Sequence, residues 1–108
     1  MGVLTHGSQC TSSVSVAELR YGARKRQSYE LSEDIERIVA EVQVIPFDEA
    51  AAGLYAEIRV ALEAAGRPLA YSDLQIAAIC LARDLTLVTG NVRHFERVPG
   101  LRVENWLS

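Results

Sequence analysis

The sequence lacks the features of exported and membrane proteins. Its two cysteines, Cys10 and Cys80, lie far apart and form no CxxC pair, so we expect both thiols to be reduced. No stretch approaches the roughly 20 consecutive apolar residues that a membrane helix needs. The first ten residues contain neither a basic nor an apolar signal region. These absences predict a cytoplasmic protein without a membrane segment.

Aromatic residues are also scarce, and the chain has no excess of positive charge. Aromatic residues make up 6% of the 108 residues, and the formal net charge is −3. This charge argues against a uniformly basic nucleic-acid-binding surface, although it is compatible with an enzyme whose metal site is acidic. The remaining composition, 49% hydrophobic and 23% charged, is typical of a globular protein. The length fits one domain over residues 1–108.

Apolar periodicity predicts strands that alternate with helices, while residues 1–9 show no periodicity. We expect strands over residues 10–15, 42–47, 85–89 and 101–106, and helices over 16–26, from Ser32, from Asp48, from Ser72 and, as a short helix or turn, over 92–97. This order is typical of a mostly parallel sheet with helices on both faces. The sequence therefore predicts the α/β class with three layers, α/β/α.

Local signals suggest where the helices begin and end. The pattern S-x-x-E from Ser15 to Glu18 fits a capping box, and Ser72 begins a similar pattern. Gly66 is a suitable residue just beyond a helix C-terminus. Almost every residue from Leu74 to Ala82 is apolar, which predicts a helix buried at the centre of the domain.

Three polar residues fall where an α/β sheet binds its ligands. Glu18, Asp73 and Asn91 each follow a predicted strand or begin a helix beside one, so they are expected at the carboxyl edge of the sheet. Carboxylates that lie close together repel one another, and a hard cation such as Mg²⁺ removes that cost. The pattern therefore indicates metal-assisted hydrolysis of a phosphodiester.

Each of these residues also has a purely structural interpretation. Glu18 would be the capping partner of Ser15, Asp73 would interact with a helix dipole, and Asn91 would be a turn residue. We interpret His94 as a partly exposed turn histidine in preference to a general base.

A basic cluster has two interpretations. Arg24, Lys25 and Arg26 either form a solvated helix end or, with Arg20, contact phosphates.

Three segments together resemble the PIN-domain ribonucleases of the VapC toxin type. They are SSVSVAELRYGA (12–23), VIPFDEAAAGLYAEIRVALEAAGRPLAYSDLQIAA (44–78) and LTLVTGNVRHFERVPGLRVENWL (85–107). The resemblance assigns Glu18 as the second acidic residue, Asp73 as the third and a principal metal ligand, Asn91 as the fourth position, and Thr89 as a supporting hydroxyl. It implies an endoribonuclease that uses Mg²⁺, or Mn²⁺, to activate a water for attack on RNA.

The same resemblance implies partners and a biological role. The chain is expected to be the toxin of a type II toxin–antitoxin pair, to act on RNA, to form a homodimer, and to be blocked by a small VapB-type antitoxin.

One part of the family pattern is absent. Family members begin with a central strand that ends in an aspartate, followed by a helix, a unit of about 30 residues. In this chain no aspartate precedes Asp34. A gap between the strands at 10–15 and 85–89 is therefore expected. The recorded start lies downstream of the true one, the gene is a truncated remnant, or residues 1–9 partly fill the gap; the first two are favoured.

Three hypotheses follow for function. The chain is a ribonuclease toxin, a non-catalytic remnant that binds an antitoxin or dimerises, or an unrelated small binding module in which Glu18 and Asp73 serve only as helix caps.

Overall fold

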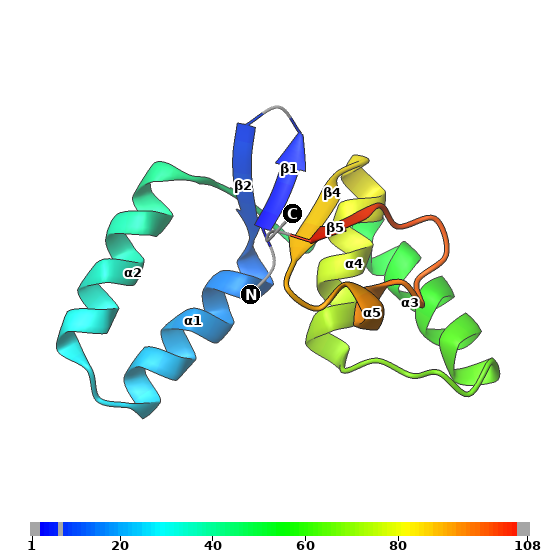
Figure 1. Cartoon of the computed structure of the whole chain (residues 1–108), viewed down its shortest axis with the longest axis horizontal. Coiled ribbons are helices and arrows are strands. Elements are labelled where there is room, and N and C mark those ends of the chain that lie inside the picture. Colours follow the sequence, from blue (N-terminus) through cyan, green and yellow to red (C-terminus); the bar gives the residue numbers. More distant parts are fainter. Residues whose placement is uncertain (1–2, 7, 106–108) are drawn as a thin grey trace.

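The computed structural model describes residues 3–6 and 8–105, with side chains described from Cys10 to Asn105. Strands and helices alternate over most of the chain (Figure 1). The strands are β1 Val3–His6, β2 Ser8–Ser12, β3 Gln43–Ile45, β4 Thr86–Thr89 and β5 Val103–Asn105. The helices are α1 Ser13–Lys25, α2 Tyr29–Glu41, α3 Glu49–Ala64, α4 Tyr71–Arg83 and α5 Val92–Phe95. The predicted α/β class is confirmed.

The five strands form one sheet in the order β3-β2-β1-β4-β5. β2 pairs with β3 and β4 pairs with β5 in parallel, whereas β1 is antiparallel to both of its neighbours, β2 and β4. Because β1 runs opposite to both, β2 and β4 point the same way. Four strands are therefore parallel to one another, as predicted, and β1 is the exception.

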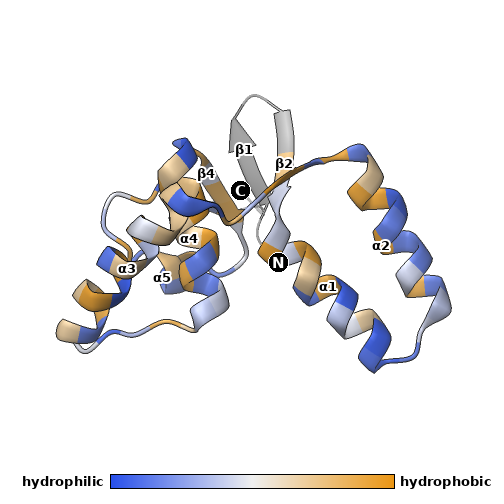
Figure 2. Ribbon diagram, turned by 180° about the vertical axis from the view of Figure 1, so that it is seen from behind, coloured by the Kyte–Doolittle hydropathy of each residue, from blue (hydrophilic) through white to orange (hydrophobic). Residues whose placement is uncertain are grey.

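The helices lie on two sides of the strands. α3 packs against α4, and α1 against α2, and the strands run between these two pairs in Figure 1. Figure 2 shows β4 on the α3/α4 side of the molecule, and its apolar residues Leu87 and Val88 lie between two threonines. The three-layer arrangement predicted from the sequence is therefore present.

Helix α4 forms the centre of the core. Its side chains Leu74 and Ile79 are 2% and 0% exposed, and Leu87 of β4 is 0% exposed. Burying an aliphatic side chain of this size stabilises a protein by about 1.5–3 kcal/mol. The buried central helix predicted from residues 74–82 is confirmed.

Both cysteines are buried and neither forms a disulfide, as expected. Burial, with a smaller contribution from Cys10, raises the pKa of the Cys80 thiol to about 12. A thiol with such a pKa is protonated at neutral pH and is a poor nucleophile. Cys80 is therefore a core residue. No helix in the described part of the chain is long and apolar enough to cross a bilayer.

Three predicted helix starts were misplaced by two to four residues. α1 is capped by Ser12, whose Oγ accepts a hydrogen bond from the Ser15 backbone N–H at 2.9 Å, so Ser15 is not the cap. α2 is capped by Ser28 and not by Ser32. α4 begins after Ala70 without a side-chain cap, so Ser72 lies inside the helix.

Other predicted helix ends were right. Asp48 caps α3 by accepting a hydrogen bond from the Ala51 N–H at 3.0 Å. Gly66 follows the α3 C-cap with φ of 70°, a conformation that glycine adopts without strain.

The expected gap in the sheet is filled. Residues predicted to be unpatterned form β1, which pairs with β2 through Leu4↔Cys10 and with β4 through Leu4↔Leu87. The less favoured explanation, in which the first residues occupy the gap, therefore describes this structure. β1 occupies the centre of the sheet, but its residues, VLTH, include no carboxylate.

We predict that Asp48→Ala lowers the free energy of unfolding by about 1–2 kcal/mol because it removes a helix cap. Ser72→Ala should cost less than about 0.5 kcal/mol, since α4 has no side-chain cap to lose. Urea denaturation followed by circular dichroism measures both, and Asp48→Asn is the control that retains a capping oxygen. Equal costs for the two alanine variants would contradict this assignment of the caps.

Candidate active site

The sheet topology brings three of the four predicted site residues, Asp73, Thr89 and Asn91, to one edge. β2 ends at Ser12 and β4 ends at Thr89, and because these strands point the same way, both ends lie at the carboxyl edge. α4 packs on β4 and finishes at Arg83, shortly before β4 begins, so its first turn returns to that edge. Asp73 lies in this first turn.

Asp73 has a single side-chain partner among the described residues. Its Oδ2 lies 2.7 Å from Nε2 of His94 in α5. The two side chains are 28% and 25% exposed, so the contact is partly shielded from solvent. Asp73 is the third residue of α4, where the helix dipole also favours negative charge.

Thr89 and Asn91 form the turn that leads from β4 into α5. The buried Oγ1 of Thr89 accepts a hydrogen bond from the Asn91 N–H at 3.1 Å. The side chain of Asn91 is exposed at the start of α5. The hydroxyl of Thr89 therefore fixes the turn and leaves the Asn91 amide accessible.

Glu18 lies on α1, the helix that follows β2, and its side chain is exposed. Helix α1 contacts α4, so the two acidic residues lie on neighbouring helices. The capping-box interpretation of Glu18 was wrong, because Ser12 caps α1 and the Oγ atoms of Ser12 and Ser15 bond to each other at 2.9 Å. An exposed carboxylate on α1 therefore remains without an assigned structural role.

The structure links the candidate residues in pairs. Asp73 is joined to His94, and Thr89 is joined to Asn91, while Glu18 forms no hydrogen bond with them. Within the described residues, no group of three or more His, Cys, Asp or Glu side chains is placed to hold a metal ion. A shared metal bound by Glu18, Asp73 and Asn91 stays a prediction.

The sequence interpretation missed the role of one residue. His94 was expected to be a partly exposed turn histidine, and its exposure agrees with that, but its contact with Asp73 was not foreseen. The available signal was its position three residues after Asn91, on the helix expected beside the predicted site.

Arg20, one of the four basic residues considered for phosphate contacts, already has a partner. Arg20 donates two hydrogen bonds to the carboxylate of Glu36, at 2.7 and 3.0 Å. These bonds lower the pKa of Glu36 and raise that of Arg20. Arg20 is thus paired within the α1/α2 hairpin, which weakens the prediction that it contacts phosphates.

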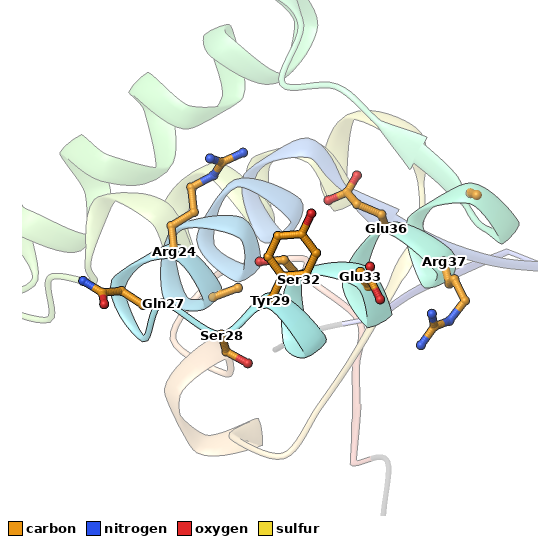
Figure 3. Close-up of a pocket in the computed structure, with 10 residues that line it drawn as sticks. Arg24, Gln27, Ser28, Tyr29, Ser32, Glu33, Glu36 and Arg37 are labelled. Atoms are coloured by element: carbon orange, nitrogen blue, oxygen red, sulfur yellow. The ribbon is translucent and has the colours of Figure 1, made fainter.

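A hollow with a volume of about 1060 Å³ lies between α1 and α2. Figure 3 shows Arg24, Tyr29, Glu36 and other polar side chains around it. None of the four predicted site residues lines this hollow. The candidate active site at the carboxyl edge of the sheet is therefore separate from this hollow.

A domain with this sheet and an acidic edge belongs to a known class. The sequence profile of the PIN domain matches residues 3–101. The chain is 44% identical over 104 residues to the tRNA(fMet)-specific endonuclease VapC of Shigella flexneri, covering 95% of this chain and 79% of that protein. It is 35% identical over 96 residues to ribonuclease VapC2 of Rickettsia felis, covering 88% and 72%. This chain belongs to the PIN-domain family.

Solved structures agree with this assignment. The chain is similar, with a TM-score of 0.85 and 33% identity, to a chain of VapBC-1 from nontypeable Haemophilus influenzae, covering 92% of this chain and 75% of that one. It is also similar to a chain of VapBC2 from Rickettsia felis, bound to a DNA fragment from its promoter. That TM-score is 0.83 at 36% identity, covering 90% and 74%.

We predict that Glu18→Ala changes the free energy of unfolding by less than about 0.5 kcal/mol, since Glu18 caps nothing. Ser12→Ala should cost about 1 kcal/mol because it removes the N-cap of α1. Urea denaturation of the two variants tests the pair. A loss near 1 kcal/mol for Glu18→Ala would restore the capping interpretation and weaken the case for a site role.

Proposed function

We propose that the chain is a divalent-metal-dependent endoribonuclease of the toxin–antitoxin type, which hydrolyses phosphodiester bonds in RNA. The observation that carries the proposal is the largely buried carboxylate of Asp73 at the carboxyl edge, which contacts His94 on the helix that follows the Thr89–Asn91 turn. The ribonuclease names of the relatives support the same reaction.

The residues at this edge fit a hard cation that keeps much of its water. Mg²⁺ commonly binds through one or two carboxylates and completes its shell with waters and phosphate oxygens. Asp73 and Glu18 supply carboxylate oxygens, and the exposed Asn91 amide supplies a neutral oxygen. Mn²⁺ accepts the same donors.

Each residue then has a distinct task. Asp73 is the principal ligand, with Glu18 and Asn91 completing the site directly or through water. Thr89 holds the turn that carries Asn91, so its task is to position Asn91. When bound, the cation stabilises the negative charge that develops on the phosphodiester. It also lowers the pKa of a water molecule at the site.

Substrate and partner follow from the relatives. Two similar proteins, from Shigella flexneri and Salmonella typhimurium, are named for cleavage of tRNA(fMet), so tRNA is the first substrate to test. Several similar structures are VapBC complexes, some of them DNA-bound. We propose a VapB-type antitoxin as the partner of this chain, and a homodimer as its assembly.

A second function is favoured by the central strand. β1 stands where the family places its first aspartate, yet residues 3–6 contain no acidic side chain. A site with one carboxylate fewer attracts a divalent cation less strongly. The alternative is therefore a non-catalytic PIN domain that binds an antitoxin or dimerises.

We predict that the purified chain cleaves tRNA in the presence of Mg²⁺ or Mn²⁺, and that EDTA abolishes the cleavage. Asp73→Ala should reduce the rate by more than about 100-fold, the upper end of what loss of an outer-shell partner costs. Glu57→Ala, which removes an exposed carboxylate on α3, is the matched control and should retain full activity. The readout is product formation on denaturing gels.

Cleavage that persists unchanged in Asp73→Ala would reject Asp73 as a site residue. Absence of metal-dependent cleavage in the wild-type chain would reject catalysis and leave the alternative.

For the alternative, we predict that the chain co-purifies with the small protein encoded immediately upstream when the two are expressed together. Asp73→Ala should leave this binding intact if the interaction does not depend on a metal. The measurement is the mass of the complex by light scattering. If neither binding nor cleavage occurs, both functions are rejected.

A further inference from the structure

We propose that His94 is a positioning residue for Asp73: its Nε2–H donates a hydrogen bond to Oδ2 and leaves Oδ1 as the oxygen available to a divalent cation. This inference rests on the proposed function, because it assigns His94 a task at the same metal site. It adds a residue that the family resemblance did not include among the site residues of this chain.

The contact has the geometry of a strong hydrogen bond. The separation of 2.7 Å lies in the range of charge-assisted bonds between a nitrogen donor and a carboxylate. Both side chains are about three-quarters buried, so solvent competes less than at an open surface. Among the described residues, Oδ1 of Asp73 has no hydrogen-bond partner. One carboxylate oxygen is therefore held, and the other remains available.

His94 is itself held in place from two directions. The Thr89–Asn91 hydrogen bond fixes the turn from which α5 begins. The His94 ring then meets the buried ring of Phe95 edge-on, with centroids 5.3 Å apart. A donor anchored in this way restricts the rotation of the Asp73 carboxylate. A metal ligand whose partner fixes its orientation binds more tightly.

A merely structural role for the contact is the competing explanation. His94 and Asp73 join α5 to α4, and the bond would also tie these segments together. A second link connects the same parts of the chain, since Arg97 Nη1 donates to the Pro68 carbonyl oxygen at 3.0 Å. Arg97→Gln therefore loosens the same region without touching Asp73, and it serves as the matched control.

The first experiment measures Mn²⁺ affinity of the full chain from the free-Mn²⁺ signal in electron paramagnetic resonance. We expect His94→Ala to weaken binding roughly 10–100-fold, the usual effect of losing an outer-shell partner. His94→Gln, whose amide N–H can replace Nε2–H, should recover most of that loss. Arg97→Gln should leave the affinity within about twofold of wild type, far from the roughly 10–100-fold loss expected when an outer-shell partner is removed. Asp73→Asn should weaken binding most.

A second measurement examines the hydrogen bond without metal. Long-range ¹H–¹⁵N spectra of the wild-type chain in EDTA should show a proton on Nε2 of His94, and Asp73→Asn should shift that resonance. Thermal unfolding in EDTA should change similarly in His94→Ala and Arg97→Gln, while only His94→Ala changes Mn²⁺ affinity. The position of the His94 proton is read from the wild-type chain. The positioning role can therefore still be tested if one of the variants folds poorly.

The outcomes distinguish the positioning role of His94 from the proposed metal site itself. If wild type binds Mn²⁺, Asp73→Asn does not, and His94→Ala equals wild type, positioning is wrong and the proposed metal site stands. If His94→Gln binds as weakly as His94→Ala, the imidazole is a direct ligand and positioning is overturned. A proton on Nδ1 alone overturns it as well. If wild type binds no Mn²⁺, the metal site and the positioning role both fail.

Discussion

The fold depends on the backbone pairing of one four-residue strand. β1 hydrogen-bonds to β2 on one side and to β4 on the other, and so joins two parallel pairs into a single sheet. The β2–β3 pair contacts α1, on which α2 packs, while the β4–β5 pair contacts α4 and α5, with α3 packed on α4 (Figure 1). Beyond β1, these halves meet mainly where α1 contacts α4. The relative placement of Glu18 and Asp73 therefore follows from how β1 sets β2 beside β4.

The direction of β1 has a chemical consequence. An antiparallel central strand presents its amino end, at Val3, to the carboxyl edges of β2 and β4, as the pairing of Val3 with Val88 shows. A parallel strand would present its last residue there, which is where the family places its first aspartate. The sheet is thus continuous from β3 to β5, but its central strand β1 supplies no carboxylate. Continuity of the sheet and the supply of acidic side chains to its carboxyl edge are therefore separate properties.

Features that depend on local sequence were predictable. The apolar run in α4, the Asp48 cap and the Gly66 turn each follow from residues within one or two turns of the element. The start of α1 was misplaced because Ser12 and Ser15 are both suitable caps. The choice between them is fixed by tertiary contacts such as that from Ser13 Oγ to the distant Phe47 N–H. β1 and the His94 contact were missed for the same reason, since both depend on partners far away in the sequence.

The pairing of Asp73 with an imidazole changes the electrostatics expected of an acidic site. Where several carboxylates converge, their mutual repulsion makes the arrangement costly until a cation binds. Here the partner of Asp73 is a nitrogen donor, so a favourable hydrogen bond replaces one repulsive neighbour and orders the carboxylate before any ion arrives. Fewer negative charges lower the attraction for a divalent cation, while prior ordering lowers the entropic cost of binding one. The balance between these opposing effects decides how strongly Asp73 and its neighbours hold a divalent cation.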